Sequence, residues 1–361
     1  MSQRGEKVLF YLLVALALFG MLFPFYWIVV TSLKAPGEVF RNQFPGLIPQ
    51  SFWVDSTKFV LKADGAAAAD PAEANKVLSN LLGANKGVIQ YSVDFTNNPG
   101  TVEINFDKKQ TTMAAMEQGF ESLGFGLISA EPPKAYDIWT NYRRVNDAQP
   151  FGRYLLNSAI VATSTTIFCL LIGSLCGYAV ARLTFPGRDA VLALILAVSM
   201  FPPIAVVSPL FLMLKSSGLL NSYWSLILPY TAFGLPLTIW TLTSFFRELP
   251  RDLEESARVD GCTRFQAFHK IILPLAAPGV FTSAILVFIG AWNEFLFSLV
   301  FVTAPKMRTV PVGITMYPGQ FETPWGTIFA AATLVTLPLV VVVFLFQKRI
   351  ISGLTAGAVK G

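Results

Sequence analysis

Six long runs of apolar residues, almost free of charged side chains, constrain this chain more than any other feature. Each run approaches or exceeds the roughly 20 residues that an α-helix needs to cross a bilayer. The chain is 53% hydrophobic and only 14% charged, which is typical of membrane proteins. The runs are Val8–Ser32, Asn157–Ala181, Ala190–Leu214, Asn221–Phe246, Gly279–Thr303 and Thr327–Gln347. We therefore predict an all-α polytopic membrane protein with six transmembrane helices.

Basic residues near the ends of these spans predict the orientation of the chain. Lys and Arg gather at the N-terminus, after the second span, between the fourth and fifth spans and after the sixth. Short cytosolic loops carry such an excess. Both termini are therefore predicted to be cytosolic, with segment 34–156 outside the membrane. Topology accounts for the net charge of +5, so we infer no nucleic-acid partner.

Residues 50–136 break the membrane pattern and predict an inserted α+β domain. Strand-like alternation near residues 58–63, 89–95 and 102–106 is interleaved with two amphipathic helices, and a last strand is predicted at 126–130. The resulting order βαββαβ is that of a ferredoxin-like sandwich. A spacer, a docking surface and a contact with an extracytoplasmic protein all remain open as roles.

The βαββαβ order resembles that of heavy-metal-associated domains, which bind metal through a Cys-x-x-Cys loop after the first strand. The corresponding loop here, residues 64–70, holds no cysteine. The chain has three cysteines, none in the external segment, and its single histidine is His269. We therefore predict no metal site, no disulfide and no histidine-based catalytic triad.

The predicted cytosolic loop between the fourth and fifth spans contains signals for two short helices. Gly261 ends the first helix, and Thr263 with Gln266 forms a capping box for the second. Phe265 and Phe268 fall on one face of that second helix. By composition alone this pair of helices either fits a groove in another protein or lies on lipid headgroups.

That loop, residues 248–278, resembles the coupling loop of the membrane subunits of ABC importers. The family pattern is Glu-Ala-Ala, three residues, Gly, then an apolar stretch and Leu-Pro. Residues that match are Glu255, Ala257, Asp260, Gly261, Phe265, Phe268, Leu273 and Pro274, with Ser256 in place of the first alanine. The resemblance implies that residues 252–272 dock onto a separate ATPase.

Further segments are similar to carbohydrate importer permeases of the maltose-transporter type, also called binding-protein-dependent transport system inner-membrane components. These segments are 141–145, 150–158, 201–203, 291–295 and 353–361. The resemblance covers about residues 1–50 and 137–361 and implies the type I ABC importer permease fold. The tail 348–361 is small, flexible and basic-ended, and the resemblance implies that it enters the ATPase dimer. The expected contacts are Gly353, Leu354, Thr355, Gly357 and Lys360.

The resemblance implies a permease subunit of an ATP-driven sugar importer in the inner membrane. Its expected partners are a second homologous permease, an ATPase homodimer, an extracytoplasmic sugar-binding protein and the lipid bilayer. No G-x-x-x-x-G-K motif occurs in the chain. ATP and Mg²⁺ are therefore expected on the ATPase, no cofactor is expected on this chain, and it is not itself an enzyme.

Polar and helix-breaking residues inside the spans mark candidate pathway positions. Pro202 and Pro203 predict a kink in the third span, either structural or part of a gate. Glu294 is the only charged residue in the six runs, and burying it alone would cost at least ~2.5 kcal/mol. It is either a buried structural acid or a pathway-lining acid. Trp292 and Asn293 beside it have the chemistry to stack on and hydrogen-bond a sugar.

Other functions remain open at this stage. An importer of a polyol or of glycerol phosphate is the nearest alternative, although a phosphate site would call for basic residues that the spans lack. A membrane-embedded enzyme would use Glu294 as its general acid or base, but no second carboxylate or serine–lysine pair accompanies it. A passive channel has no use for an ATPase-docking loop.

Overall fold

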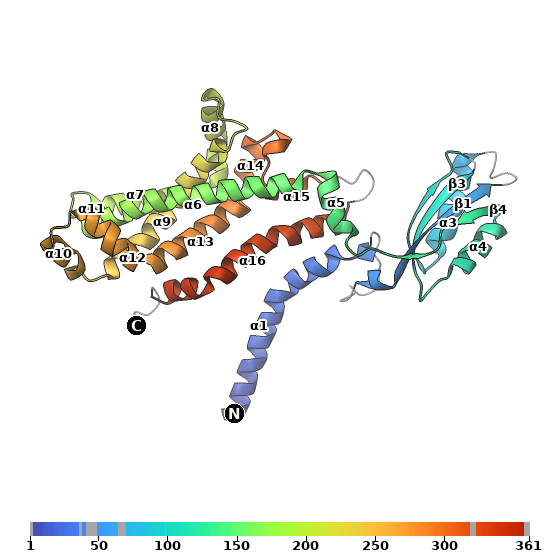
Figure 1. The fold of residues 1–361 in the computed structure, drawn as a ribbon, viewed down its shortest axis with the longest axis horizontal. Helices are drawn as coiled ribbons and strands as arrows, with labels where there is room; N and C mark the ends of the chain where they lie inside the picture. Colours follow the sequence, from blue (N-terminus) through green and yellow to red (C-terminus); the bar gives the residue numbers. More distant parts are fainter. Residues whose placement is uncertain are drawn as a thin grey trace. The chain divides into compact units, whose positions relative to one another are not determined.

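The computed structural model of the chain describes residues 3–35, 38–40, 49–63, 70–97, 99–317 and 323–356. The chain divides into two compact units, each of which is described by itself (Figure 1). The first consists of Met1–Ala148 with Tyr317–Thr333. The second consists of Gln149–Met316 with Leu334–Gly361.

An antiparallel sheet with two helices forms the α+β part of the first unit. Its elements are β1 (Val54–Ala63), α3 (Pro71–Ala84), β2 (Val88–Asp94), β3 (Gly100–Asp107), α4 (Met113–Ser122), β4 (Phe125–Ala130) and β5 (Lys134–Ala135). The strands follow the order β2-β3-β1-β4, and the short β5 pairs with β1. The element order is βαββαβ, and the sheet order is the one expected when each βαβ crossover skips a neighbouring strand.

Local sequence explains why α3 and the core beneath it form. Asp70 caps α3 by accepting a 2.9 Å hydrogen bond from the Ala72 amide, and Pro71 follows at the first turn. Alternate residues of β1 point to one face of the sheet, where Phe59 lies fully buried. Its ring meets Phe120 of α4 edge-on with a 5.2 Å centroid separation. Both helices therefore cover the same face of the sheet.

Replacing Phe120 by alanine should lower the free energy of unfolding of the α+β part by about 3–5 kcal/mol, because a large buried ring leaves a cavity. Urea-dependent hydrogen exchange of β1 amides in the full-length chain measures this change. Leu127→Ala is the matched control, since Leu127 is exposed on β4 of the same sheet. Equal losses in both variants would contradict the assigned core.

The rest of the first unit comprises α1 (Gln3–Ser32), η1 (Glu38–Phe40), η2 (Gln50–Trp53) and α5 (Thr140–Ala148). The buried Asn141 amide of α5 donates to the carbonyl oxygens of Ser32 at 2.9 Å and Lys34 at 2.8 Å. These bonds satisfy carbonyls at the end of α1 that have no partner within the helix.

The second unit is a helical bundle. Its elements are α6 (Phe151–Arg182), α7 (Arg188–Ser199), α8 (Pro203–Ser216), α9 (Trp224–Glu248), α10 (Asp252–Val259), α11 (Arg264–Ala267), η3 (Phe268–Ile272), α12 (Leu273–Leu275), α13 (Ala277–Asn293), α14 (Leu296–Phe301), η4 (Pro305–Met307) and α15 (Val310–Thr315), and α16 (Trp325–Ala356) contributes its later part. Helix α6 packs along α9 and α13 (Figure 1). Gly173 permits this approach, because a Cβ there would lie 2.6 Å from Thr238 Cγ2.

Within the described residues, four helical segments are long and apolar enough to cross a membrane, namely Glu6–Ser32, Phe151–Arg182, Trp224–Glu248 and Trp325–Gln347. Two bent pairs could each add one span. One joins Arg188–Ser199 to Pro203–Ser216 at 92°, and the other joins Arg264–Leu275 to Ala277–Asn293 at 76°. The predicted count of six is reached only if each bent pair is one span.

Sequence predictions about helix continuity hold only in part. The third predicted span bends at Pro202–Pro203 as predicted, but as two separate helices, and the fifth is interrupted after Asn293. The segment after residue 347 continues α16 to Ala356, so Gly353, Leu354 and Thr355 are helical rather than part of a flexible tail. Gly357 and Lys360 lie outside the described residues.

Candidate functional site

The Pro202–Pro203 pair separates α7 from α8 instead of kinking a single helix. Pro203 restricts Pro202 to an extended conformation, with φ −67° and ψ 124°, and then begins α8. Since neither proline has a backbone N–H, no helical hydrogen bond spans the junction at these positions. This interruption permits the 92° bend between the two helices.

Glu294 stands at the second interruption, between α13 and α14. Its backbone is extended, with φ −69° and ψ 126°, and its carboxylate caps the start of α14. Oε1 accepts from the Phe297 amide at 2.9 Å, and Oε2 accepts from the Ser298 amide at 3.3 Å. The Tyr230 hydroxyl of α9 donates to Oε2 at 2.5 Å. The acid therefore has three donors and satisfies helix amides that would otherwise lack partners.

A cavity of about 260 Å³ lies beside this carboxylate. Pro203, Tyr230 and Glu294 line it together with Phe233 and Gly234, so α8, α9 and α13 all contribute to its wall. Most of the remaining lining is aliphatic. The cavity therefore offers one acid and one phenol in largely apolar surroundings, a composition suited to orienting a polar solute without holding it tightly.

The structure brings only two of the five predicted pathway residues to this cavity, Pro203 and Glu294. Trp292 is buried and stacks on Phe288 with a 5.6 Å centroid separation. Asn293 turns back to its own helix, where its amide donates to the Ile289 carbonyl at 3.0 Å. Neither of these side chains, nor Pro202, lines the cavity.

The predicted coupling segment, residues 252–272, folds as two short helices joined by a tight turn. Helix α10 ends at Val259, and Gly261 adopts the left-handed conformation with φ +86°, which favours glycine over residues that carry a side chain. The Cys262 amide donates to the Ala257 carbonyl at 2.9 Å and closes the turn. Helix α11 then begins with the capping box of Thr263 and Gln266, as the sequence indicates.

Apolar contacts fasten this segment to the bundle on one side and leave its other side exposed. Phe268 and Ile272 are buried in a cluster with Tyr178 and Phe246 of α6 and α9. By contrast, Phe265 is 66% exposed. Phe265 and Phe268 lie next to each other, as the helical spacing predicts, with ring centroids 6.3 Å apart, but only Phe268 is buried against the bundle.

Polar contacts add to this attachment. The Tyr178 hydroxyl donates to Glu254 Oε1 at 2.6 Å, and Arg182 Nη2 donates to the Leu249 carbonyl at 2.7 Å. Glu255 is exposed and lines a small charged cleft of about 140 Å³ with four arginines. Ala257 is buried, whereas Asp260 is exposed at the turn. Leu273 and Pro274 begin α12 below the cluster.

Sequence reasoning missed Tyr230, Tyr178 and Glu254. Tyr230 is one of many hydroxyl-bearing residues in its run, so the sequence did not single it out as a partner of Glu294. Tyr178 and Glu254 are 76 residues apart, so only the packing of α6 against the coupling segment reveals their contact.

Comparisons with known proteins agree with this architecture. The family described as "Binding-protein-dependent transport system inner membrane component" matches residues 151–355. The trehalose transport system permease SugB of Mycobacterium tuberculosis is 48% identical over 61% of this chain and 81% of its own length. The trehalose/maltose permease MalG of Thermococcus litoralis gives the same identity and coverage. The sulfoquinovosyl glycerol permease SmoH of Agrobacterium fabrum is 47% identical over 61% of this chain and 78% of its own.

A solved structure extends the likeness beyond the matched region. A chain of a bacterial ABC transporter involved in the import of the acidic polysaccharide alginate superposes with a TM-score of 0.63 and 16% identity. The alignment covers 96% of this chain and 97% of the other, and at this identity it shows the ABC importer permease fold alone. From the family match over more than half of its length, the chain belongs to the binding-protein-dependent transport system inner membrane components.

Proposed function

We propose that the chain is one of two permease subunits of an ATP-driven sugar importer of maltose or trehalose type. The observation that carries this proposal is the coupling segment, which buries Phe268 in the bundle and exposes Phe265 to a partner. An exposed aromatic side chain on a rigid turn is a typical anchor for a groove in another protein. Sugar is favoured because relatives 47–48% identical are named as permeases for trehalose, maltose or a sulfoquinovosyl glycerol.

ATPase movement would reach the membrane helices through the attachments of the coupling segment. Phe268 packs against Tyr178 with a 4.7 Å centroid separation, and Tyr178 also holds Glu254. Because α10 and η3 are both fixed to α6, a displacement of the segment would carry α6 along with it. The bundle would then alternate between inward-open and outward-open arrangements while nucleotide binds and is hydrolysed on the ATPase homodimer. ATP and Mg²⁺ belong to that partner.

The cavity beside Glu294 is the proposed part of the sugar pathway in this subunit. Its carboxylate is held by α14 and Tyr230, so it would present fixed oxygens to sugar hydroxyls at a break between helices. Transporters use such interrupted helices at substrate sites. A homologous second permease would complete the pathway.

The proposed topology has six spans in the inner membrane and both termini in the cytosol. The spans are the four long helical segments, α7 with α8, and α13 with α14, which leaves residues 252–272 in the cytosol. The α+β part within residues 50–136 would then lie outside, facing an extracytoplasmic sugar-binding protein. The helical end of α16 would point its last residues toward the ATPase dimer.

The test is ATP hydrolysis by the reconstituted complex in proteoliposomes. We expect an ATPase to copurify with the chain. We also expect maltose or trehalose to stimulate ATP hydrolysis only when the binding protein is present. Stimulation by glycerol phosphate or a polyol alone would overturn the sugar assignment. Absence of any copurifying ATPase would overturn the permease assignment itself.

A further inference from the structure

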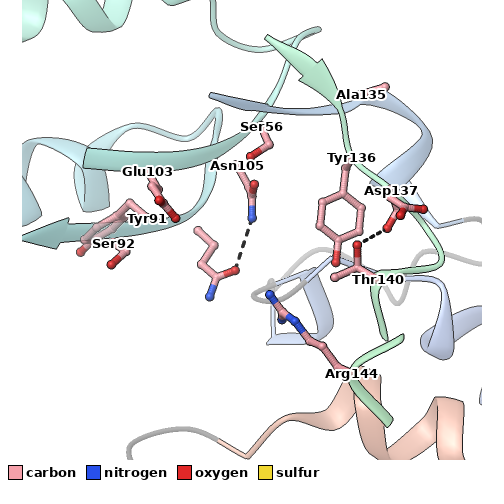
Figure 2. Close-up of a pocket in the computed structure, with 11 residues that line it drawn as sticks. Ser56, Tyr91, Ser92, Glu103, Asn105, Ala135, Tyr136, Asp137, Thr140 and Arg144 are labelled. Carbon is pink, nitrogen blue, oxygen red and sulfur yellow. Dashed lines mark hydrogen bonds between the residues drawn. The ribbon is translucent and has the colours of Figure 1, made fainter. Parts of the chain in front are cut away.

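The sheet face opposite α3 and α4 forms a polar cleft that the transport pathway does not use. Strand alternation turns Ser56 of β1, Gln90 of β2, and Glu103 and Asn105 of β3 toward this face. The cleft has a volume of about 350 Å³, within the range of about 300–1,000 Å³ that is usual for small-molecule sites (Figure 2).

The segment after β5 supplies the second wall of the cleft. Ala135 pairs with Asp55 of β1, and the Tyr136 amide donates to the Val54 carbonyl at 2.8 Å. These bonds fix the Tyr136 ring and the beginning of α5 next to the sheet. Figure 2 shows the Tyr136 hydroxyl and the Arg144 guanidinium facing the same space.

Two groups in the cleft have hydrogen-bonding capacity that the protein does not use. Among the described residues, the buried Tyr136 hydroxyl has no hydrogen-bond partner. The Thr140 hydroxyl beside it donates to the Asp137 carbonyl at 2.6 Å. Burial raises the pKa of the Tyr136 phenol, against the opposing effects of the nearby Arg144 charge and of Thr140, so the phenol stays neutral. Asn105 Nδ2 donates to Gln90 Oε1 at 3.4 Å, a long bond that leaves most of both amides available.

Arg144 is the one cation among the described residues that line the cleft. Glu103 pairs with Lys58 at 3.0 Å, and Asp137 pairs with Arg143 at 2.9 Å. Within the described part of the chain Arg144 forms no ion pair. Its planar guanidinium suits two neighbouring hydroxyls or one carboxylate.

From these groups we propose that the cleft binds a saccharide. Amides, hydroxyls, a guanidinium and a tyrosine ring match the hydroxyl-rich edges and the apolar face of a sugar ring. A lipid would need aliphatic walls, and a phosphate would call for more than one free cation. Binding itself rests on this lining alone, whereas a role in capturing sugar outside the membrane rests on the proposed function.

The experiment is calorimetric titration of the full-length chain in nanodiscs with a neutral maltooligosaccharide and, separately, with an oligogalacturonate. Saturable binding of at least one of them is expected, and it should weaken about tenfold or more in Arg144→Ala and in Asn105→Ala. Tyr136→Phe removes only the Tyr136 hydroxyl and should also weaken binding, so it replaces Asn105→Ala if that variant misfolds. Lys134→Ala is the matched control, because Lys134 is a neighbouring exposed cation outside the lining.

The titration with oligogalacturonate shows whether Arg144 binds a carboxylate or hydroxyl groups of the sugar. Preference for the oligogalacturonate that disappears in Arg144→Ala would assign a carboxylate, and equal loss for both ligands would assign hydroxyls. Absence of binding at millimolar sugar overturns the cleft proposal, even where sugar still stimulates ATP hydrolysis by the complex. Binding abolished by Glu294→Gln but unchanged in the cleft variants would also overturn it, because the sugar would then occupy the pathway cavity.

Discussion

Replacing Gly261 by valine is expected to reduce sugar-stimulated ATP hydrolysis about tenfold in the reconstituted complex. Gly261 has φ +86°, and a side chain in that region costs about 1–2 kcal/mol, at the upper end when it is β-branched. Such a cost lowers the population of the docking-competent turn by a factor of about 5–30. Apart from its two chain neighbours, none of the described residues has an atom within 4 Å of a Cβ built at this position, so backbone strain rather than a clash causes the effect.

Two further variants make this result specific to the coupling turn. Gly218→Val imposes the same kind of strain at φ +67°, also in open space, in the turn after α8. It should leave ATPase stimulation within about twofold of the wild type once equal amounts of folded protein are compared. Gly261→Asn should retain most activity, because asparagine tolerates the left-handed region. A loss with Gly218→Val as large as that with Gly261→Val would contradict the coupling role.

The coupling segment was predictable in its local parts. The capping box of Thr263 and Gln266 depends on residues three apart, and such a contact is visible in sequence. The difference in burial between Phe265 and Phe268 was not predictable, because it depends on the cluster of Tyr178 and Phe246, which covers Phe268 and leaves Phe265 exposed. Helical spacing alone places both rings on one face.

Breaks and continuations of helices were harder to predict than the helices themselves. The two prolines correctly indicated an interruption, but the 92° angle depends on what α8 packs against. Small residues near Gly353 suggested a flexible arm, whereas α16 continues through them to Ala356. One glycine costs only roughly 1 kcal/mol in a helix, which is not enough to end α16 at Gly353.

The α+β part shows the same division between local and distant information. Alternation and turn residues predicted the βαββαβ order of its elements. The polar cleft was not predictable, because its second wall depends on the two-residue pairing of β5 with β1. A two-residue strand has no sequence signal of its own.

Replacing Glu294 by alanine should have a larger effect than replacing Gly261 by valine. It leaves the amides of Phe297 and Ser298 and the Tyr230 hydroxyl without their acceptor. Each unsatisfied buried donor costs about 1–3 kcal/mol, so the start of α14 would lose at least about 3 kcal/mol. That corresponds to a decrease of roughly a hundredfold in the correctly assembled cavity, measured as sugar uptake into proteoliposomes.

Two milder variants separate a structural from a pathway role for the carboxylate. Tyr230→Phe keeps the cap on α14 and removes only one donor, so a purely structural acid predicts near-normal uptake. Glu294→Gln keeps an oxygen for the Phe297 amide but places an amide where the sugar would meet a carboxylate. Uptake that falls at least tenfold in Glu294→Gln, with normal assembly, supports the pathway role.

Leu299→Ala completes the comparison, since Leu299 is exposed on α14 and takes no part in the cap. If Leu299→Ala lost uptake as fully as Glu294→Ala, any change in α14 would abolish uptake. The specific role assigned to the Glu294 carboxylate would then be contradicted. If only the Glu294 variants lose uptake, one acid both ends an interrupted helix and presents its oxygens to the cavity. The cost of burying it is then balanced by the two amide donors that the interruption creates and by the Tyr230 hydroxyl of α9.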